Sequence, residues 1–468
     1  MVSVLVLASM PFWADAQGAD HSGGNGGDGI RCASGRAEIA INACTHIIED
    51  KREDPDNRAI ALRNRAFTYQ QRGDLEHAIA DYTTALKRTE QRRLQAKIYL
   101  NRGLTYFQKG DETAALADYG EAVSQDPKLA SAYINRAAIF ARRGDSEGAL
   151  ADLDRATQLD PNDYGSFMSR GSINVQRGEH ELAVAAFTRA IELNPADARA
   201  WRSRGFAYHA LGDNARAAAD SAEALRLDPN MAAAHLDLAL SLQSSGDASR
   251  AMAEFDKAID LEPLNAQALK ARGDSYLARG ESERALEDFS RAISLDPGMT
   301  AAYINRGAIY LARSSWDLAI VDFTSAITLD PKQYAAYLNR GQALGAKHER
   351  EHAIADFTQA IRLESGALEA YRRRAFVRQE GGDSQGAIDD YNQAIDRNPK
   401  DAEALRGRGY ARLNRHEVDA AIADLSAAIT CNPGDALAYR FRSSAYAAKK
   451  DFTRANSDDA AARRLGAT

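Results

Sequence analysis

The chain repeats its own pattern at steps of 34 residues (161 − 127 = 34) between Pro127 and Pro433. Prolines mark these steps at positions 127, 161, 195, 229, 263, 297, 331, 399 and 433, and Ser365 stands at the step that lacks one. A period of this length is typical of arrays in which one supersecondary unit is copied along an axis. Because each unit of such an array contacts its neighbours, we expect the 468 residues to form an elongated array instead of separate globular domains.

Each unit is predicted to contain two helices joined by a tight turn. Between Thr300 and Lys332, apolar residues recur at steps of three and four in two successive runs, which is the spacing of one helix face. In most units a Gly-Asp pair, such as Gly212-Asp213, separates the runs. Glycine can take the left-handed conformation that ends the first helix, and aspartate can cap the second. The proline that follows prevents the second helix from continuing.

Small residues determine how closely the two helices of a unit can meet. One slot of the first helix always holds Gly, Ala or Ser. One slot of the second helix holds alanine in all twelve units, at positions 78, 115, 149, 183, 217, 251, 285, 319, 353, 387, 421 and 455. A close helix crossing leaves no room for a larger side chain. The aromatic residues at helical spacing around these slots are therefore interpreted as core and not as a cofactor site.

The unit resembles the tetratricopeptide repeat, with an aromatic residue, Gly or Ala, Tyr, Ala, Phe or Tyr, Ala and Pro following one another over 34 residues (161 − 127 = 34). Twelve such units span 59–468. The resemblance implies an all-α fold, an α-solenoid in which antiparallel helix pairs stack into a right-handed superhelix. It also implies a concave groove, lined by the first helices, that binds protein or peptide segments without catalysis and without a cofactor.

The N-terminal part is predicted to contain three segments of different kinds. Residues 1–16 combine a short apolar run with Ala14-Asp15-Ala16, which resembles a secretory signal and its cleavage site. The run is too short to form a stable membrane span. A Gly-rich linker is expected over 17–31, and a capping segment over 32–58 with a single helix over 37–49.

The cysteines allow two interpretations that depend on the compartment. In an exported protein, Cys32 and Cys44 are expected to form a disulfide that fixes the capping segment. In a cytosolic protein they would be two free buried thiols. Cys431 stands where other units hold leucine, as at Leu295 and Leu329, and is expected to be a buried small hydrophobic residue.

Charged residues also follow the repeat. The arginine of an Asn-Arg-Gly triplet recurs in eleven of the twelve units and is replaced by Leu238 in one. An acidic residue recurs on the second helix in eleven units and is replaced by Ala186 in one. We expect these residues to form a ladder of half-buried ion pairs that fixes the register of the helices. The alternative is that the arginines collect anions.

His348-Glu349-Arg350-Glu351-His352 matches the zinc-protease pattern H-E-x-x-H. This chemistry needs both histidines on one helix face, with the glutamate activating a zinc-bound water. The repeat register instead places His348 in the glycine slot of the turn, so that Glu351 and His352 are the securely helical members of the motif. We therefore expect no metal site.

The candidate binding residues come from the family's groove-lining positions. Their residues in the fifth repeat and in the last three repeats are Arg202, Phe206, Arg372, Phe376, Arg406, Tyr410 and Arg440. The alternation of cation and ring in the last three repeats suits an acidic peptide, a C-terminal carboxylate or a polyanion. A solvated basic strip is the alternative. We expect Arg406 and Tyr410 to face solvent.

These features predict an exported, non-enzymatic scaffold of a bacterial envelope that binds peptide or protein segments in its groove. The net charge of −7 argues against a general nucleic-acid binder, which would usually be basic. A polysaccharide- or polyanion-binding accessory factor of envelope assembly or export is the second hypothesis. A zinc-dependent hydrolase at His348 and His352 is the third.

Overall fold

The structure is a computed structural model that describes residues 27–33 and 37–466. Within these residues every regular element is a helix and none is a strand. The helices form two compact units, Met1–Leu261 and Glu262–Thr468. The predicted signal segment at 1–16 lies outside the described residues, as does the linker predicted from residue 17 up to residue 26.

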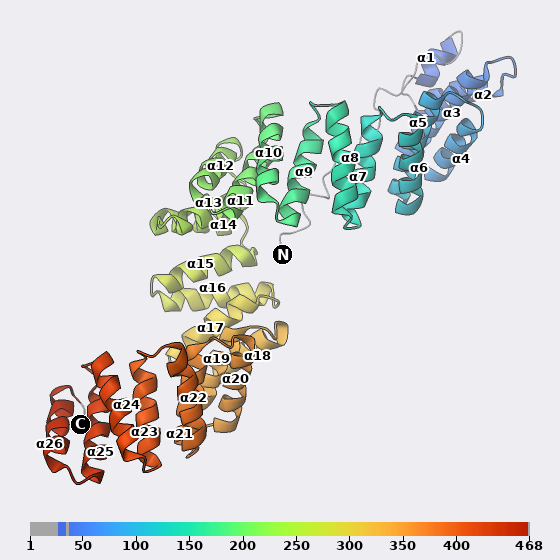
Figure 1. Cartoon of the computed structure of the whole chain (residues 1–468). Coiled ribbons are helices and arrows are strands. Elements are labelled where there is room, and N and C mark those ends of the chain that lie inside the picture. Colours follow the sequence, from blue (N-terminus) through green and yellow to red (C-terminus); the bar gives the residue numbers. More distant parts are fainter. Residues whose placement is uncertain (1–26, 34–36, 467–468) are drawn as a thin grey trace. The chain divides into compact units, whose positions relative to one another are not determined.

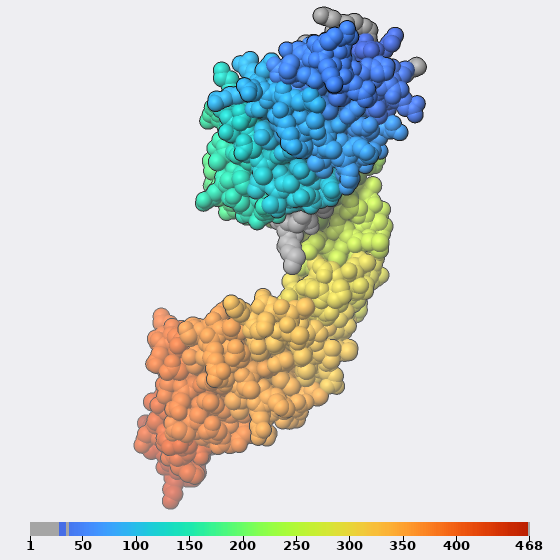
Figure 2. All heavy atoms as spheres, turned by 90° about the vertical axis from the view of Figure 1, so that its right-hand side faces the viewer, coloured from blue at the N-terminus to red at the C-terminus, as the bar shows by residue number. Residues whose placement is uncertain are grey.

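Unit 1 contains two N-terminal helices followed by six helix pairs (Figure 1). Its helices are α1 (Gly27–Ala33), α2 (Ala37–Glu49), α3 (Pro55–Gln71), α4 (Leu75–Leu86), α5 (Arg92–Lys109), α6 (Glu112–Gln125), α7 (Ala130–Arg142), α8 (Ser146–Leu159), α9 (Tyr164–Arg177), α10 (His180–Leu193), α11 (Ala198–Ala210), α12 (Asn214–Leu227), α13 (Ala232–Ser244) and α14 (Ala248–Leu261). Each helix packs mainly on those next to it in sequence, so the colours of the space-filled unit pass from blue to green in order (Figure 2).

Unit 2 contains six further helix pairs of the same kind in its described residues. Its helices are α15 (Ala266–Ala278), α16 (Ser282–Leu295), α17 (Thr300–Ala312), α18 (Trp316–Leu329), α19 (Tyr334–Ala346), α20 (Arg350–Leu363), α21 (Leu368–Glu380), α22 (Ser384–Arg397), α23 (Ala402–Asn414), α24 (Val418–Cys431), α25 (Ala436–Ala448) and α26 (Phe452–Arg464). We number the pairs as repeats, from repeat one (α3 and α4) to repeat twelve (α25 and α26). The odd-numbered helix of each pair is its first helix.

The turn between the two helices follows the predicted chemistry in repeats that keep the Gly-Asp pair. In repeat five, Gly212 has a φ of 79° and ends α11, and the Asp213 carboxylate accepts a hydrogen bond from the Arg216 backbone N–H at the start of α12. Other residues take the same left-handed conformation in four repeats of unit 2, at Ser314, His348, His416 and Lys450. The turn is therefore set by the repeat as a whole and does not require glycine.

The two helices of a repeat cross closely at the small residues. Ala319 is fully buried, and a Cβ atom added to Gly307 would lie 2.8 Å from Cε1 of Phe323. The aromatic side chains opposite the glycines are likewise among the most buried of the described residues, as at Phe289 and Phe357. This arrangement confirms the predicted core.

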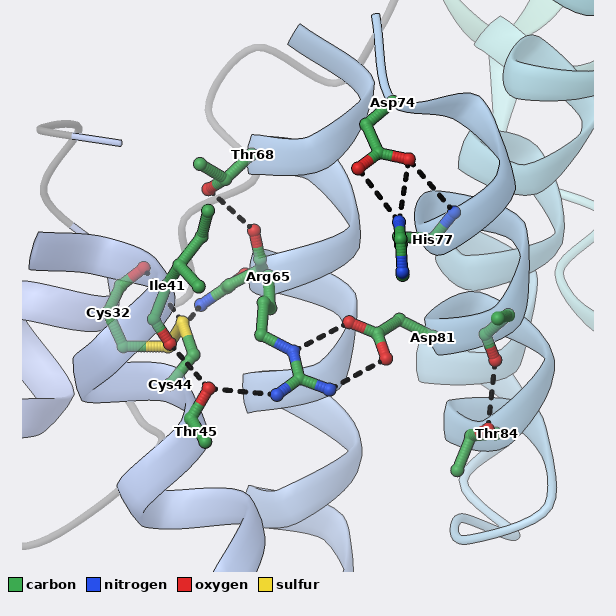
Figure 3. A network of polar contacts seen from close by, with 12 residues as sticks. Cys32, Ile41, Cys44, Thr45, Arg65, Thr68, Asp74, His77, Asp81 and Thr84 are labelled. Atoms are coloured by element: carbon green, nitrogen blue, oxygen red, sulfur yellow. Dashed lines mark hydrogen bonds and ion pairs between the residues drawn. A yellow bond between two sulfur atoms is a disulfide. The ribbon is translucent and has the colours of Figure 1, made fainter. Parts of the chain in front are cut away.

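The N-terminal helices cover the first repeat. The helix α2 has the predicted bounds, whereas α1 begins at Gly27, inside the segment predicted as linker. A disulfide joins Cys32 of α1 to Cys44 of α2 (Figure 3). Both half-cystines are buried in an apolar cluster that includes Ala61 of α3. The disulfide therefore links the short helix α1 to α2, and the two half-cystines pack with α3 of the first repeat.

One expectation about the C-terminal half was wrong. Cys431 is exposed, because it is the last residue of α24 and lies at the surface, like Leu295 and Leu329 at the same place in their repeats. On the last helix, Asp458 is buried and paired with Arg442, whereas Asp459 and Arg463 form an exposed pair at 2.8 Å.

We predict that Ala319→Leu lowers the free energy of unfolding by about 1–3 kcal/mol, because the crossing of α17 and α18 leaves no space for the added methyl groups. Chemical denaturation followed by circular dichroism measures the change. Leu318→Ala, which alters the exposed neighbour, should have little effect and is the control. Equal stability of wild type and Ala319→Leu would show that the helix crossing is looser than described.

Candidate functional site

An ion pair between an arginine of the first helix and an aspartate of the second recurs in the repeats, and Figure 3 shows it for Arg65 and Asp81 of repeat one. The Arg65 Nε and Nη2 atoms donate to the two carboxylate oxygens of Asp81 at 2.7 and 2.8 Å. The third nitrogen, Nη1, donates to the Thr45 hydroxyl of the preceding helix at 2.8 Å. The side-chain hydrogen bond to Asp81 raises the pKa of Arg65 above its usual value. The guanidinium thus links three helices.

This pair recurs in ten repeats of the described chain, and the aspartate always stands 16 positions after the arginine. The arginines are Arg65, Arg102, Arg136, Arg204, Arg272, Arg306, Arg340, Arg374, Arg408 and Arg442. The predicted ladder is confirmed. Burial raises the pKa of Asp118, and the hydrogen bond and charge of Arg102 oppose this shift. Because a buried ion pair adds little net stability, we expect the pairs to fix the register of the helices.

Two repeats depart from the ladder. In repeat six, where Leu238 replaces the arginine, His235 lies 2.5 Å from the Glu254 carboxylate through its Nδ1 atom. In repeat four, where Ala186 replaces the aspartate, Arg170 meets Asp154 of the preceding repeat at 3.0 Å. In these two repeats the remaining partner of the ladder, Glu254 or Arg170, therefore contacts a different side chain.

The candidate residues of the last three repeats lie on α21, α23 and α25, and the first helices of neighbouring repeats contact one another. Arg372 forms ion pairs with Glu369 of its own helix and with Asp401 and Glu403 of the next repeat. Burial alone would raise the pKa of Glu369, but hydrogen bonds from Arg372 and Arg373 outweigh it and lower the pKa. Arg372 is therefore held by carboxylates of its own chain.

Arg406 and Tyr410 are less exposed than the sequence suggested. The Arg406 side chain is 27% exposed, and its Nη1 atom donates to Asp435 of the next repeat at 2.7 Å. The Tyr410 ring stacks on Phe441 with ring centroids 4.3 Å apart. Both residues are thus partly exposed, and each also contacts the following repeat. Arg440, one repeat further on, is exposed.

The candidate residues of repeat five have a similar arrangement. Arg202 of α11 donates through Nε to Asp237 of α13 at 2.7 Å. Burial raises the pKa of Asp237, and Arg202 acts in the opposite direction. Phe206 lies one turn further along α11 and is partly exposed. Arg202 thus has a carboxylate partner in its own chain, like Arg372 and Arg406.

A pocket lies beside Phe376. It has a volume of about 260 Å³ and is lined mainly by residues of α19 and α21, with His348 of the turn and Phe357 of α20. Phe376 itself is 54% exposed. The first-helix surface of unit 2 therefore offers a concave apolar site next to charged residues.

The two histidines of the H-E-x-x-H pattern, His348 and His352, stand on different elements. His348 has a φ of 62° and stands in the turn, and Glu349 occupies the N-cap position of α20 without a capping hydrogen bond from its side chain. His352 lies on the helix, with its Nδ1 atom 3.3 Å from the Glu349 carboxylate. Among the residues that the structure describes, no three His, Cys, Asp or Glu side chains are placed to hold a metal ion.

Sequence reasoning missed the acidic partners of the candidate arginines. Asp401 and Asp435 cap the first helices of their repeats and lie 29 residues after Arg372 and Arg406 respectively. This spacing was a usable signal, because it matches an arginine of one repeat to the cap of the next. For Arg202 of repeat five, the residue 29 positions later is Met231, which is not acidic, and Asp237 accepts the hydrogen bond from Arg202 instead.

In the part of the chain that the structure describes, no helix has the length and apolar character needed to cross a bilayer.

Family models agree with the helix pairs, the small-residue crossings and the 34-residue step (161 − 127 = 34). Four models, each described as a tetratricopeptide or TPR repeat, match residues 61–92, 103–144, 137–200, 169–232, 236–300, 270–334, 334–366 and 373–436. The chain belongs to the tetratricopeptide repeat family. Members of this family are protein-binding scaffolds, and the fold is typically non-catalytic.

Solved structures of similar fold come from different settings. The Cut9–Hcn1 heterotetramer of the APC/C is 16% identical, with 90% of each chain covered and a TM-score of 0.42. PilF of Pseudomonas aeruginosa is 21% identical, and the match covers 44% of this chain and 95% of PilF with a TM-score of 0.41. Yeast Tom70 is 17% identical, with 88% and 100% covered and a TM-score of 0.34. No curated protein matches the chain.

We predict that Asp322→Ala lowers the free energy of unfolding by about 2–3 kcal/mol, because Arg306 then loses its bidentate acceptor in a largely buried place. Replacing both partners, with Arg306→Met and Asp322→Leu, should lower it less, since no unpaired charge remains. Chemical denaturation measures both. Asp419→Ala removes an exposed partner of Lys449 and should change stability by less than about 0.5 kcal/mol. A smaller loss for the single variant than for the double would contradict this interpretation.

Proposed function

We propose that the chain is a protein-interaction scaffold whose first helices in repeats nine to twelve, α19, α21, α23 and α25, bind a segment of a partner protein. The observation that carries this proposal is Phe376, a half-exposed aromatic residue at the edge of a pocket of about 260 Å³. The pocket supports the docking of one apolar side chain of the partner. The stacked rings of Tyr410 and Phe441 extend the apolar surface along α23 and α25.

The charges around this surface favour a protein segment over a polyanion. Arg372 and Arg406 are accompanied by the carboxylates of Glu369, Asp401 and Asp435, which would repel a densely charged anion. A peptide can instead place single acidic groups near the exposed Arg440 and apolar groups near Phe376. Protein interfaces commonly combine an aromatic anchor, which becomes buried on binding, with a polar rim.

The catalytic alternative has little support in the geometry. The histidines of the zinc-protease pattern stand on different elements, the turn and the helix α20, and their neighbours Glu349 and Lys347 form ordinary surface ion pairs. We therefore propose a role without catalysis.

We also propose that the protein is exported to an envelope compartment. The disulfide between Cys32 and Cys44 supports this proposal, because such bonds persist in oxidising compartments and are rare in the cytosol. The apolar run and the Ala14-Asp15-Ala16 sequence add the features of a secretory signal.

We predict that Phe376→Ala combined with Tyr410→Ala weakens binding to the natural partner more than tenfold, about 1.4 kcal/mol, because both apolar anchors are lost. The partner is first captured from extracts of the source cells on the immobilised wild-type chain and identified by mass spectrometry. Titration calorimetry with that partner then compares the variants. Leu318→Ala, which removes an equally exposed residue (52%) from the second helix α18, should bind like wild type. Unchanged affinity of the double variant would place the binding surface elsewhere.

We predict that protein purified from its native host begins near Gln17 and contains one alkylatable cysteine. Cys431 is exposed and serves as an internal control for the alkylation, whereas Cys32 and Cys44 should react only after reduction. Intact-mass measurement with and without reductant distinguishes these states. An unprocessed N-terminus with three reactive thiols would argue for a cytosolic protein.

A further inference from the structure

Repeat four lacks the aspartate of the ion-pair ladder but keeps the arginine. Arg170 of α9 stands at the position that Arg65 occupies in Figure 3, and Ala186 of α10 stands where Asp81 lies in repeat one. In the ten complete repeats the aspartate accepts hydrogen bonds from both Nε and Nη2. The arginine of repeat four therefore retains a binding geometry for a carboxylate that its own repeat does not provide.

A pocket of about 230 Å³ occupies this place, between α8, α9 and α10. Leu150, Phe167 and Leu182 form its apolar sides. Its polar side consists of Arg170 and Asn174 together with the carboxylates of Asp154 and Glu179, of which Glu179 is paired with Arg177 at 2.9 Å. Asn174 contributes to the space as well, because repeats five and eight carry the larger Tyr208 and Tyr310 at the same position. Two side chains smaller than those of the general pattern thus open the pocket together.

The polar atoms of the pocket are incompletely bonded. The Arg170 Nε atom is buried and has no acceptor among the described residues, and Asn174, which is 4% exposed, has no donor there for its Oδ1 atom. Asp154 of α8 meets the Nη2 atom of Arg170 at 3.0 Å, but its side chain is 53% exposed, and the Nε atom of Arg170 stays without an acceptor among the described residues. Buried polar atoms without partners are costly, so a ligand that satisfies them would gain affinity.

We propose that this pocket binds the carboxylate of an aspartate or glutamate side chain from a protein partner. The incoming carboxylate would accept from Arg170 Nε, as the aspartate of the other repeats does. The backbone N–H of the same peptide would donate to Asn174, and flanking apolar side chains would pack on Leu150 and the exposed Leu182. The site lies in unit 1 on other helices than the surface of repeats nine to twelve, so it goes beyond the function proposed above and does not depend on it.

The test uses the full chain and two short probes, acetyl-Leu-Asp-Leu-amide and acetyl-Leu-Asn-Leu-amide, which differ in charge but hardly in shape. Ligand-observed NMR titrations give the dissociation constants. Wild type should bind the aspartate probe at least tenfold more tightly than the asparagine probe, and more tightly than acetate. Ala186→Asp should abolish this preference, because the new carboxylate accepts from Arg170 in place of the probe. The same contact should raise the melting temperature. Arg170→Gln should also abolish it.

Gln158→Glu is the matched control, because it adds the same charge on the exposed side of α8 and should bind like wild type. Circular dichroism confirms that each variant is folded. The proposal is overturned if wild type binds both peptides equally, or if Ala186→Asp keeps the preference. It is also overturned if acetate binds as tightly as the aspartate probe, since the pocket would then accept a free small carboxylate. These outcomes are independent of Phe376→Ala, which tests the surface in unit 2.

Discussion

The close crossing of the two helices within a repeat is the contact on which the other features depend. At Gly307 an added Cβ atom would approach Phe323 to 2.8 Å, so the two backbones are held at a fixed distance and register. That register brings an arginine of the first helix opposite an aspartate 16 residues later, close enough for two hydrogen bonds. It also leaves one side of each first helix uncovered, where the pocket beside Phe376 lies. The small residues thus determine which side chains reach the surface, because they set the distance and register of the two helices.

Much of the fold could be predicted because the relevant contacts are local and repeated. The apolar spacing between Thr300 and Lys332 agrees with α17 and α18, and the small-residue slots identify the crossing. The ladder followed from the constant separation of arginine and acid. The position of Cys431 was wrong, because the last turn of a second helix emerges at the surface and periodicity alone does not show where burial ends. Leu295 and Leu329, which end the second helices of their repeats, are exposed too.

The candidate site was predicted less well, and the reason is physical. Alignment of repeats identified Arg372 and Arg406 as surface residues, but their partners Asp401 and Asp435 belong to the next repeat. Contacts between repeats depend on how neighbouring first helices approach each other, which a pattern within one repeat does not contain. Places where a repeat departs from the pattern, such as Ala186, are more informative about binding than places where it agrees. Residues that keep the repeat pattern hold the helices together, whereas residues that break it leave groups to which a partner can bind.

The turns within the repeats imply a difference in local stability along the chain. In unit 1 the left-handed turn position is occupied by glycine, as at Gly144 and Gly178, whereas in unit 2 four repeats force a residue with a Cβ atom into it. Each such residue costs about 1 kcal/mol relative to glycine. Transient opening of single helix pairs is therefore less costly near Ser314, His348, His416 and Lys450. Backbone amides of these repeats should exchange with solvent sooner than those of unit 1, and the half of the molecule with the aromatic pocket would be the more adaptable one.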